Sequence, residues 1–193
     1  MKKSYICFMG GTFGDLTERI INNGVNLKID LKLTLKSGNF TEKLKNEIYS
    51  LDLNCLVGHS TEPLIWNWDR IGYVINILND ELLTICAKRY FLLCPNIEEF
   101  KSPLEIGFSK KLLDKTRSIN DRINLYKVLL KNFSNIEFKT STKINLDCIY
   151  DKNLYINTLL QHFSFDIKKA HFIYDEWFTK EQYVLQKLGQ SFN

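Results

Sequence analysis

The chain opens with a short apolar run that is followed by a segment of helical spacing. Tyr5 to Phe8 are consecutive apolar residues and two glycines end the run, so we expect a buried strand from Lys3 to Met9. Apolar residues then recur on one helix face from Asp15 to Asn23, and Asn22-Asn23-Gly24 provides the stop. The first elements are therefore predicted to be a strand, a glycine-containing turn and a helix.

The pattern changes after Gly24. Apolar and polar residues alternate strictly from Val25 to Leu35, which is typical of a half-buried strand or of an extended arm. A helix is predicted from Thr41 to Ser50, with Thr41 as its cap. A second buried strand is expected at Leu53–Val57.

Strands and helices continue to alternate along the rest of the chain. Asp80 is the expected cap of one helix, and Asn120 that of the second part of another. Further strands are expected at Ile71–Leu78 and Lys143–Tyr150, and helices at Asp80–Leu93, Leu112–Phe133, Asp151–Phe163 and Asp175–Leu188. Because strands separated by helices favour a mainly parallel sheet with helices on both faces, we expect one three-layer α/β domain over residues 1–193.

Composition indicates a globular protein and argues against several classes of function. Of the 193 residues, 45% are hydrophobic and 25% charged, and no apolar run approaches the ~20 residues of a membrane-spanning helix. The five cysteines are scattered without a CxxC pair, which predicts neither a zinc site nor a disulfide framework. The net charge of +4 comes from dispersed lysines, which argues against nucleic-acid binding. We expect reduced thiols and a cytoplasmic location.

The turn after the first strand is the first candidate site. It consists of Gly10, Gly11, Thr12, Phe13 and Gly14. Glycines allow the backbone to approach an anion closely, and the start of the following helix favours negative charge, so the turn is predicted to bind phosphate. Neither a Walker A motif nor a full GxGxxG is present. The alternative is a plain turn, because Asp15 at the helix start would cap the helix and repel a phosphate.

His59 is the second candidate. It follows a predicted parallel strand, and ligands of open α/β sheets bind outside the carboxyl ends of the strands. An imidazole with a pKa near neutrality is suited to act as a general base there. The alternative is a loop histidine that is hydrogen-bonded to Ser60 or Thr61.

The order of these elements resembles that of the sulfotransferase-like proteins, which have a P-loop-like α/β fold. The resemblance covers most of the chain and lies in the pattern of elements more than in specific motifs. It implies that Gly10–Gly14 would hold the 5′-phosphosulfate of 3′-phosphoadenosine 5′-phosphosulfate. It also implies that His59 would deprotonate an acceptor hydroxyl.

A second phosphate site follows from the same resemblance. The segment Tyr73–Thr84 is similar to the family's strand-turn-helix unit that binds the 3′-phosphate. Asn79, with either Thr84 or Cys86, stands near the positions where the family has an arginine and a serine. Met9 and Gly10 stand near the position of the family's first-turn lysine or arginine. The chain therefore departs from the family at the cations that bind phosphate.

The resemblance implies a protein, viral or bacterial in origin, that transfers a sulfo group from a nucleotide donor to a hydroxyl of a carbohydrate or small molecule. The alternative is a non-catalytic binding or assembly protein, virion-associated if viral, that keeps the fold. In that case the arm Val25–Leu35 would add to the sheet edge of a partner, either a second copy or another protein.

Overall fold

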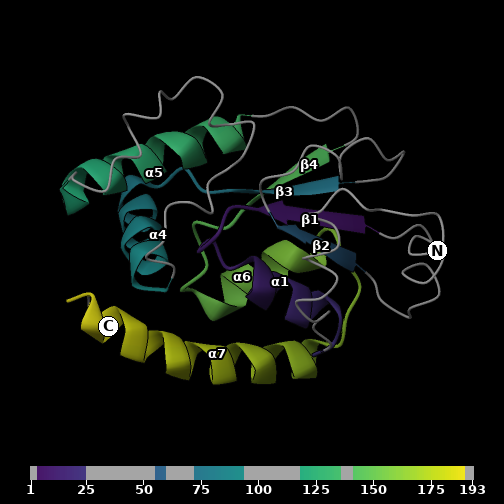
Figure 1. Cartoon of the computed structure of the whole chain (residues 1–193). Helices are drawn as coiled ribbons and strands as arrows, with labels where there is room; N and C mark the ends of the chain where they lie inside the picture. Colours follow the sequence, from purple (N-terminus) through teal and green to yellow (C-terminus); the bar gives the residue numbers. More distant parts are fainter. Residues whose placement is uncertain (1–3, 25–54, 60–71, 94–117, 136–140, 190–193) are drawn as a thin grey trace, which may run out of the picture.

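In the computed structural model, which describes residues 4–24, 55–59, 72–93, 118–135 and 141–189, a parallel sheet forms the centre of the fold (Figure 1). The described strands are β1 Ser4–Phe8, β2 Cys55–His59, β3 Gly72–Asn76 and β4 Ser141–Asn145. They lie in the order β2-β1-β3-β4, and each neighbouring pair is parallel. The expected α/β class with a parallel sheet is confirmed.

β1 is flanked by strands on both sides, which explains why its sequence is a continuous apolar run. Tyr5 pairs with Leu56 on β2 and with Gly72 on β3. Ile6 and Cys7 are fully buried, as residues of a parallel strand covered on both faces must be. The chain leaves β1 toward β2 on one side, and β3 lies on the other. The carboxyl ends of β1 and β3 therefore form a topological switch point, where α/β sheets bind ligands.

The described helices surround this sheet (Figure 1). α1 and α6 lie along one side of the sheet, with α7 packed across them on the outside, while α4 and α5 pack together near the end toward which β1 runs. Their bounds are α1 Gly14–Ile21, α4 Asp80–Leu93, α5 Ile119–Ser134, α6 Lys152–Leu160 and α7 Ile167–Lys187. In the part of the chain that the structure describes, no helix combines the length and apolar character needed to cross a membrane.

The end of α1 confirms the predicted stop. Gly24 N–H donates to Arg19 O at 2.6 Å and Asn23 N–H donates to Ile20 O at 3.1 Å, the hydrogen-bond pattern of a Schellman motif. Asn23 has φ 53° and Gly24 has φ 97°, and these left-handed conformations suit asparagine and glycine better than other residues.

Two predicted helix caps are wrong by one or two residues. Asn79, not Asp80, caps α4, because its Oδ1 accepts from Leu82 N–H at 2.9 Å and Asp80 is already helical. Ser118, not Asn120, caps α5, because its Oγ accepts from Asp121 N–H at 3.2 Å. A capping oxygen must belong to the residue that precedes the helix in order to reach an N–H group in its first turn.

Two predicted boundaries also need correction. α7 begins at Ile167 and not at Asp175, because Asp166 Oδ1 accepts from the N–H groups of Lys168 and Lys169 and starts the helix early. β4 covers Ser141–Asn145 and does not reach Tyr150, because the chain turns at 146–151 with Ile149 N–H bonded to Leu146 O at 3.0 Å. The strand predicted at Val25–Leu35 and the helix at Thr41–Ser50 lie outside the described residues.

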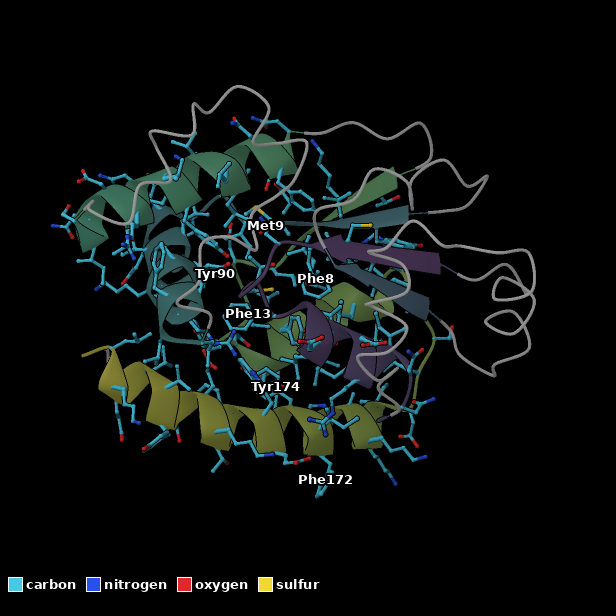
Figure 2. The ribbon with its side chains drawn as sticks, in the orientation of Figure 1. Phe8, Met9, Phe13, Tyr90, Phe172 and Tyr174 are labelled. Atoms are coloured by element: carbon cyan, nitrogen blue, oxygen red, sulfur yellow. The ribbon has the colours of Figure 1, made fainter. Side chains whose placement is uncertain are left out.

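Aromatic side chains fill the space between the sheet and the helices. Figure 2 shows Phe8, Phe13, Tyr90 and Tyr174 in the interior, whereas Phe172 points away from α7 to the outside. The buried Tyr174 hydroxyl donates to Ile149 O at 2.7 Å, so this ring satisfies its polar atom within the core. The core therefore extends from the sheet through the α1 and α6 layer to α7.

Candidate anion site at the glycine turn

The chain makes a tight turn directly after β1. Thr12 N–H donates to Met9 O at 3.1 Å, and Gly11, the third residue of this β-turn, has φ 81°. The Thr12 hydroxyl also donates to Met9 O, at 2.6 Å, and Thr12 is fully buried. The hydroxyl that the sequence suggested as a ligand donor is therefore engaged within the turn.

Positive φ recurs at alternate positions of this turn. Gly11 has φ 81° and Phe13 has φ 64° and ψ 16°, while Thr12 between them does not have positive φ. A phenylalanine in this left-handed region costs about 1–2 kcal/mol, so its surroundings must hold it there. Alternation of hand along a short segment directs successive N–H groups into one concavity, which is the geometry of anion-binding nests.

Three N–H groups of this turn are not engaged within the part of the chain that the structure describes. Among the described residues, no acceptor bonds to the N–H groups of Gly11, Phe13 or Gly14, and no side chain caps α1. Phe13 and Gly14 are buried, and a buried N–H group without a partner is costly. The same groups lie at the positive end of the α1 dipole. An anion at this position would accept hydrogen bonds from these N–H groups and would be attracted by the positive end of the helix dipole.

Two glycines of the turn are required by packing. A Cβ on Gly14 would lie 2.1 Å from the ring of Phe8. A Cβ on Gly11 would lie 3.2 Å from Tyr90 Cβ and 3.3 Å from the Tyr126 hydroxyl, in addition to the cost of φ 81°. The glycines thus allow β1, α4 and α5 to approach the turn closely.

The carbonyl groups of the turn face donors on α4 and α5. The Tyr126 hydroxyl donates to Gly10 O, and Arg89 Nη1 donates to Gly11 O at 3.4 Å. Two carbonyl groups of the turn are therefore bonded to side chains of α4 and α5. Gly10 and Gly11 are partly exposed, whereas Thr12, Phe13 and Gly14 are buried.

Arg89 is a cation at the turn that the sequence did not indicate. Its Nε lies 3.0 Å from Glu181 Oε2 on α7, and its guanidinium lies 4.8 Å above the centre of the Phe13 ring. The side chain is only 15% exposed, and the described residues supply no acceptor for its remaining N–H groups. Since 78 residues separate Arg89 from Gly11, no local spacing in the sequence could have predicted this contact.

Glu181 holds the guanidinium of Arg89 in place. Its carboxylate is buried and accepts from the Tyr150 hydroxyl at 3.2 Å as well as from Arg89. Burial, followed by the nearby Glu181 charge, raises the pKa of Tyr150, so this phenol remains protonated and a donor. The Phe13 ring packs edge-on against Tyr150 and Trp177 of the same cluster. Low polarity around the turn strengthens any charge interaction there.

His59 lies at the same end of the sheet. It is the last residue of β2, and not a loop residue as predicted, because its main chain still pairs in register with Phe8 of β1. Adjacent strands lie about 4.8 Å apart, so the His59 backbone is close to the start of the glycine turn. The structure thus places the main chain of His59 near the glycine turn that the sequence had singled out separately.

The α4 amino terminus, where the resemblance implies a second phosphate, is engaged by the protein itself. Asp147 Oδ1 accepts from Leu78 N–H at 3.1 Å and from Asn79 N–H at 3.2 Å, while the Asn79 side chain caps the helix. The Thr84 hydroxyl donates to Asp80 O at 2.9 Å inside the first turns of α4. Asn79 and Thr84 remain predicted cofactor ligands, but their polar atoms have partners here.

The described residues contain no group of three or more histidine, cysteine or carboxylate side chains that could hold a metal ion. Comparison with protein-family models, with curated proteins and with solved structures finds no match for this chain.

Proposed function

We propose that this chain is a sulfotransferase-like protein that binds the phosphosulfate of a nucleotide donor at the turn of residues 9–14. The observation that carries the proposal is the alternation of positive φ at Gly11 and Phe13, with N–H groups that lack acceptors in the described part of the chain. This turn lies at the carboxyl end of a central parallel strand, at the switch point of the sheet. A P-loop-like sulfotransferase architecture, with helices on both faces of the sheet, belongs to the same proposal.

The residues of the turn would bind and orient the anionic group. The N–H groups of Gly11, Phe13 and Gly14 would donate to its oxygens, and Arg89 would compensate its charge from α4, in place of the lysine or arginine of the family's first turn. 3′-Phosphoadenosine 5′-phosphosulfate supplies an activated sulfo group when bound. His59 would accept the proton of a carbohydrate or small-molecule hydroxyl at the neighbouring strand end.

Calorimetric titration with 3′-phosphoadenosine 5′-phosphate tests the binding step. We expect saturable binding, and no binding of adenosine, because the phosphate oxygens provide the interaction. Arg89→Gln should weaken binding at least about tenfold, since a hydrogen bond to a charged group contributes about 1.5–3 kcal/mol. Lys152→Gln is the matched control, because Lys152 also pairs with an acidic residue of α7, Asp175 at 2.9 Å, but lies at the start of α6 and outside the turn.

The outcome that contradicts the proposal is an absence of heat at high micromolar nucleotide with correctly folded protein. Equal binding by Arg89→Gln and Lys152→Gln would remove the role of Arg89 while leaving the turn as the site. A discontinuous assay that follows transfer of labelled sulfate to a mixture of sugar and phenol acceptors then tests catalysis.

A second function is favoured by Asp147. Its carboxylate bonds to the Leu78 and Asn79 amides where a second phosphate would bind, so the chain is suited to a non-catalytic role on the same fold. In that case 3′-phosphoadenosine 5′-phosphate would bind no more tightly than adenosine 5′-phosphate. A clear preference for the 3′-phosphorylated nucleotide would argue for the enzyme.

A further inference from the structure

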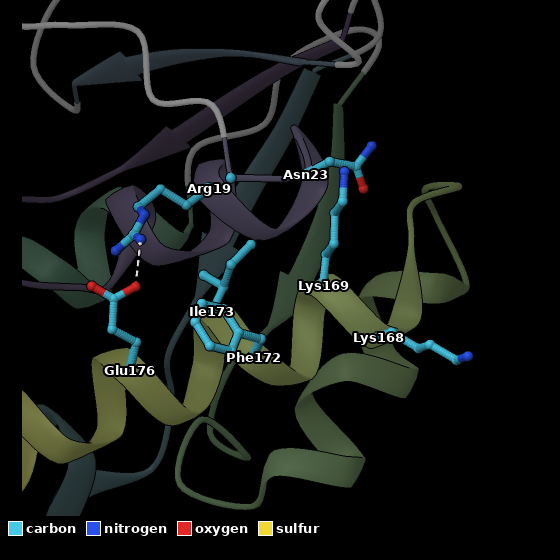
Figure 3. Close-up of a pocket in the computed structure, with 8 residues that line it drawn as sticks. Arg19, Asn23, Lys168, Lys169, Phe172, Ile173 and Glu176 are labelled. Carbon is cyan, nitrogen blue, oxygen red and sulfur yellow. Dashed lines mark hydrogen bonds and ion pairs between the residues drawn. The ribbon is translucent and has the colours of Figure 1, made fainter.

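An open pocket of about 420 Å³ lies between the carboxyl end of α1 and the first turns of α7 (Figure 3). Its volume is in the range of small-molecule sites. Arg19 and Asn23 line it from the α1 side, and Lys168, Lys169, Phe172 and Glu176 line it from α7. The pocket is distinct from the glycine turn. Ile173 lines the pocket, whereas Glu181, which binds Arg89 at the glycine turn, lies about 12 Å further along the axis of α7.

The walls of the pocket are held by defined contacts. Asn23 Oδ1 accepts from Asp166 N–H at 2.8 Å, which ties the end of α1 to the start of α7. A Cβ on Gly24 would meet Ile173 Cδ1 at 3.7 Å, so the chain passes close over this buried side chain. The pocket is therefore built from a Schellman motif and two helical turns.

The pocket carries excess positive charge. Arg19 Nη2 lies 3.1 Å from Glu176 Oε2, and Lys180 Nζ lies 2.9 Å from Glu176 Oε1. These two cations, Lys180 first, lower the pKa of Glu176, so its charge is already compensated. Lys168 and Lys169 have no acidic partner among the described residues. An anion in the pocket would meet lysines that no described carboxylate neutralises.

An aromatic ring stands beside these cations. Phe172 is 72% exposed, whereas Ile173, which also lines the pocket, is buried (Figure 3). An exposed ring offers a stacking surface for a flat apolar group. Cations and an exposed ring around one hollow together suit a ligand that is both anionic and aromatic.

We propose that this pocket binds a small organic anion in which a carboxylate or phosphate is joined to an aromatic body. The anionic group would lie between Arg19 and Lys169, and the aromatic body would cover Phe172. This site does not depend on the function proposed for the glycine turn.

Indole-3-acetate is a suitable probe, with indole and acetate as its two halves. In amide correlation spectra of the full ¹⁵N-labelled chain, we expect saturable shifts for Asn23, Gly24 and residues 168–176 with indole-3-acetate. Indole or acetate alone should shift these amides at least tenfold more weakly at equal concentration. Shifts of equal size with indole alone, or none in this region, would overturn the proposal.

Substitutions on α7 separate a site from a generally basic surface. The double variant Lys168→Glu with Lys169→Glu, and the single variant Phe172→Ser, should each weaken the probe at least tenfold. The matched control is Tyr183→Ser with Lys187→Glu, which removes an exposed cation–aromatic pair further along the same helix. Unchanged binding in the pocket variants, or an equal loss in the control, would refute the assignment.

Discussion

At the scale of single residues, two ion pairs that join an arginine to a glutamate of α7 differ in burial. The Arg89–Glu181 pair has side chains that are 15% and 1% exposed, whereas the Arg19–Glu176 pair is 29% and 40% exposed. A buried charge that loses its partner keeps its full desolvation cost, while an exposed charge regains water. The two pairs should therefore contribute to stability very differently.

We expect Glu181→Gln to lower the free energy of unfolding by about 3 kcal/mol, because Arg89 would remain buried without its carboxylate. Glu176→Gln should lower it much less, since that pair is exposed to solvent. Urea unfolding of both variants measures the difference. Similar losses for the two variants would show that Glu181 does not support the turn.

The same residues show what the sequence could predict of the site. Glycines after an apolar run indicate a turn, and that turn is found between β1 and α1. Arg89 and Glu181 are 92 residues apart, and their meeting depends on how α4 and α7 pack, which no short spacing encodes. Local sequence patterns therefore identified the glycine turn but not Arg89 beside it.

At the scale of elements, the sequence located every described strand and helix but misplaced several ends. The spacing of apolar residues predicts well whether a segment is a helix or a strand, since burial of one face imposes that spacing. The end of a helix depends on which side-chain oxygen reaches a free N–H group. Neighbouring Asn, Asp and Ser residues are equally good caps, so the sequence does not distinguish between them. Asn79 and Asp80 illustrate this, because only the structure shows that Asn79 accepts from Leu82.

Asp147 provides a test at this scale, because it bonds to the amino terminus of α4 from outside the helix. We expect Asp147→Ala to lose about 1–2 kcal/mol of stability, since the Leu78 and Asn79 amides lose a charged acceptor. If these amides form a phosphate-type site, sulfate should raise the melting temperature of this variant more than that of the wild type.

Asp151→Ala is the matched control for that experiment. Asp151 caps α6 through Leu154 N–H at 3.0 Å, where no phosphate is predicted. Sulfate should not recover the stability of this variant. An equal effect of sulfate on both variants would mean that the ion acts on helix ends in general and not on the α4 terminus.

At the scale of the whole molecule, the sheet order determines where chemistry can occur. Alternating strands and helices predicted parallel pairing, but the position of β1 between β2 and β3 follows only from the fold. That position explains both the full burial of Ile6 and Cys7 and the location of the glycine turn at the switch point. The core around the sheet also contains cysteine thiols and tyrosine phenols that burial keeps neutral.

These neutral groups predict how stability changes with pH. Burial raises the pKa values of the Cys7 and Cys86 thiols and of the Tyr155 and Tyr174 phenols above their ordinary values. In the unfolded chain the same groups lose protons near about pH 9–10, so the unfolded state binds fewer protons there than the folded state. Their contribution is therefore complete below about pH 8 and is lost as pH rises, at about 1.4 kcal/mol per pH unit for each group. Urea unfolding between neutral pH and about pH 11 measures this slope; a free energy of unfolding that stayed constant above about pH 10 would contradict the burial of these four side chains.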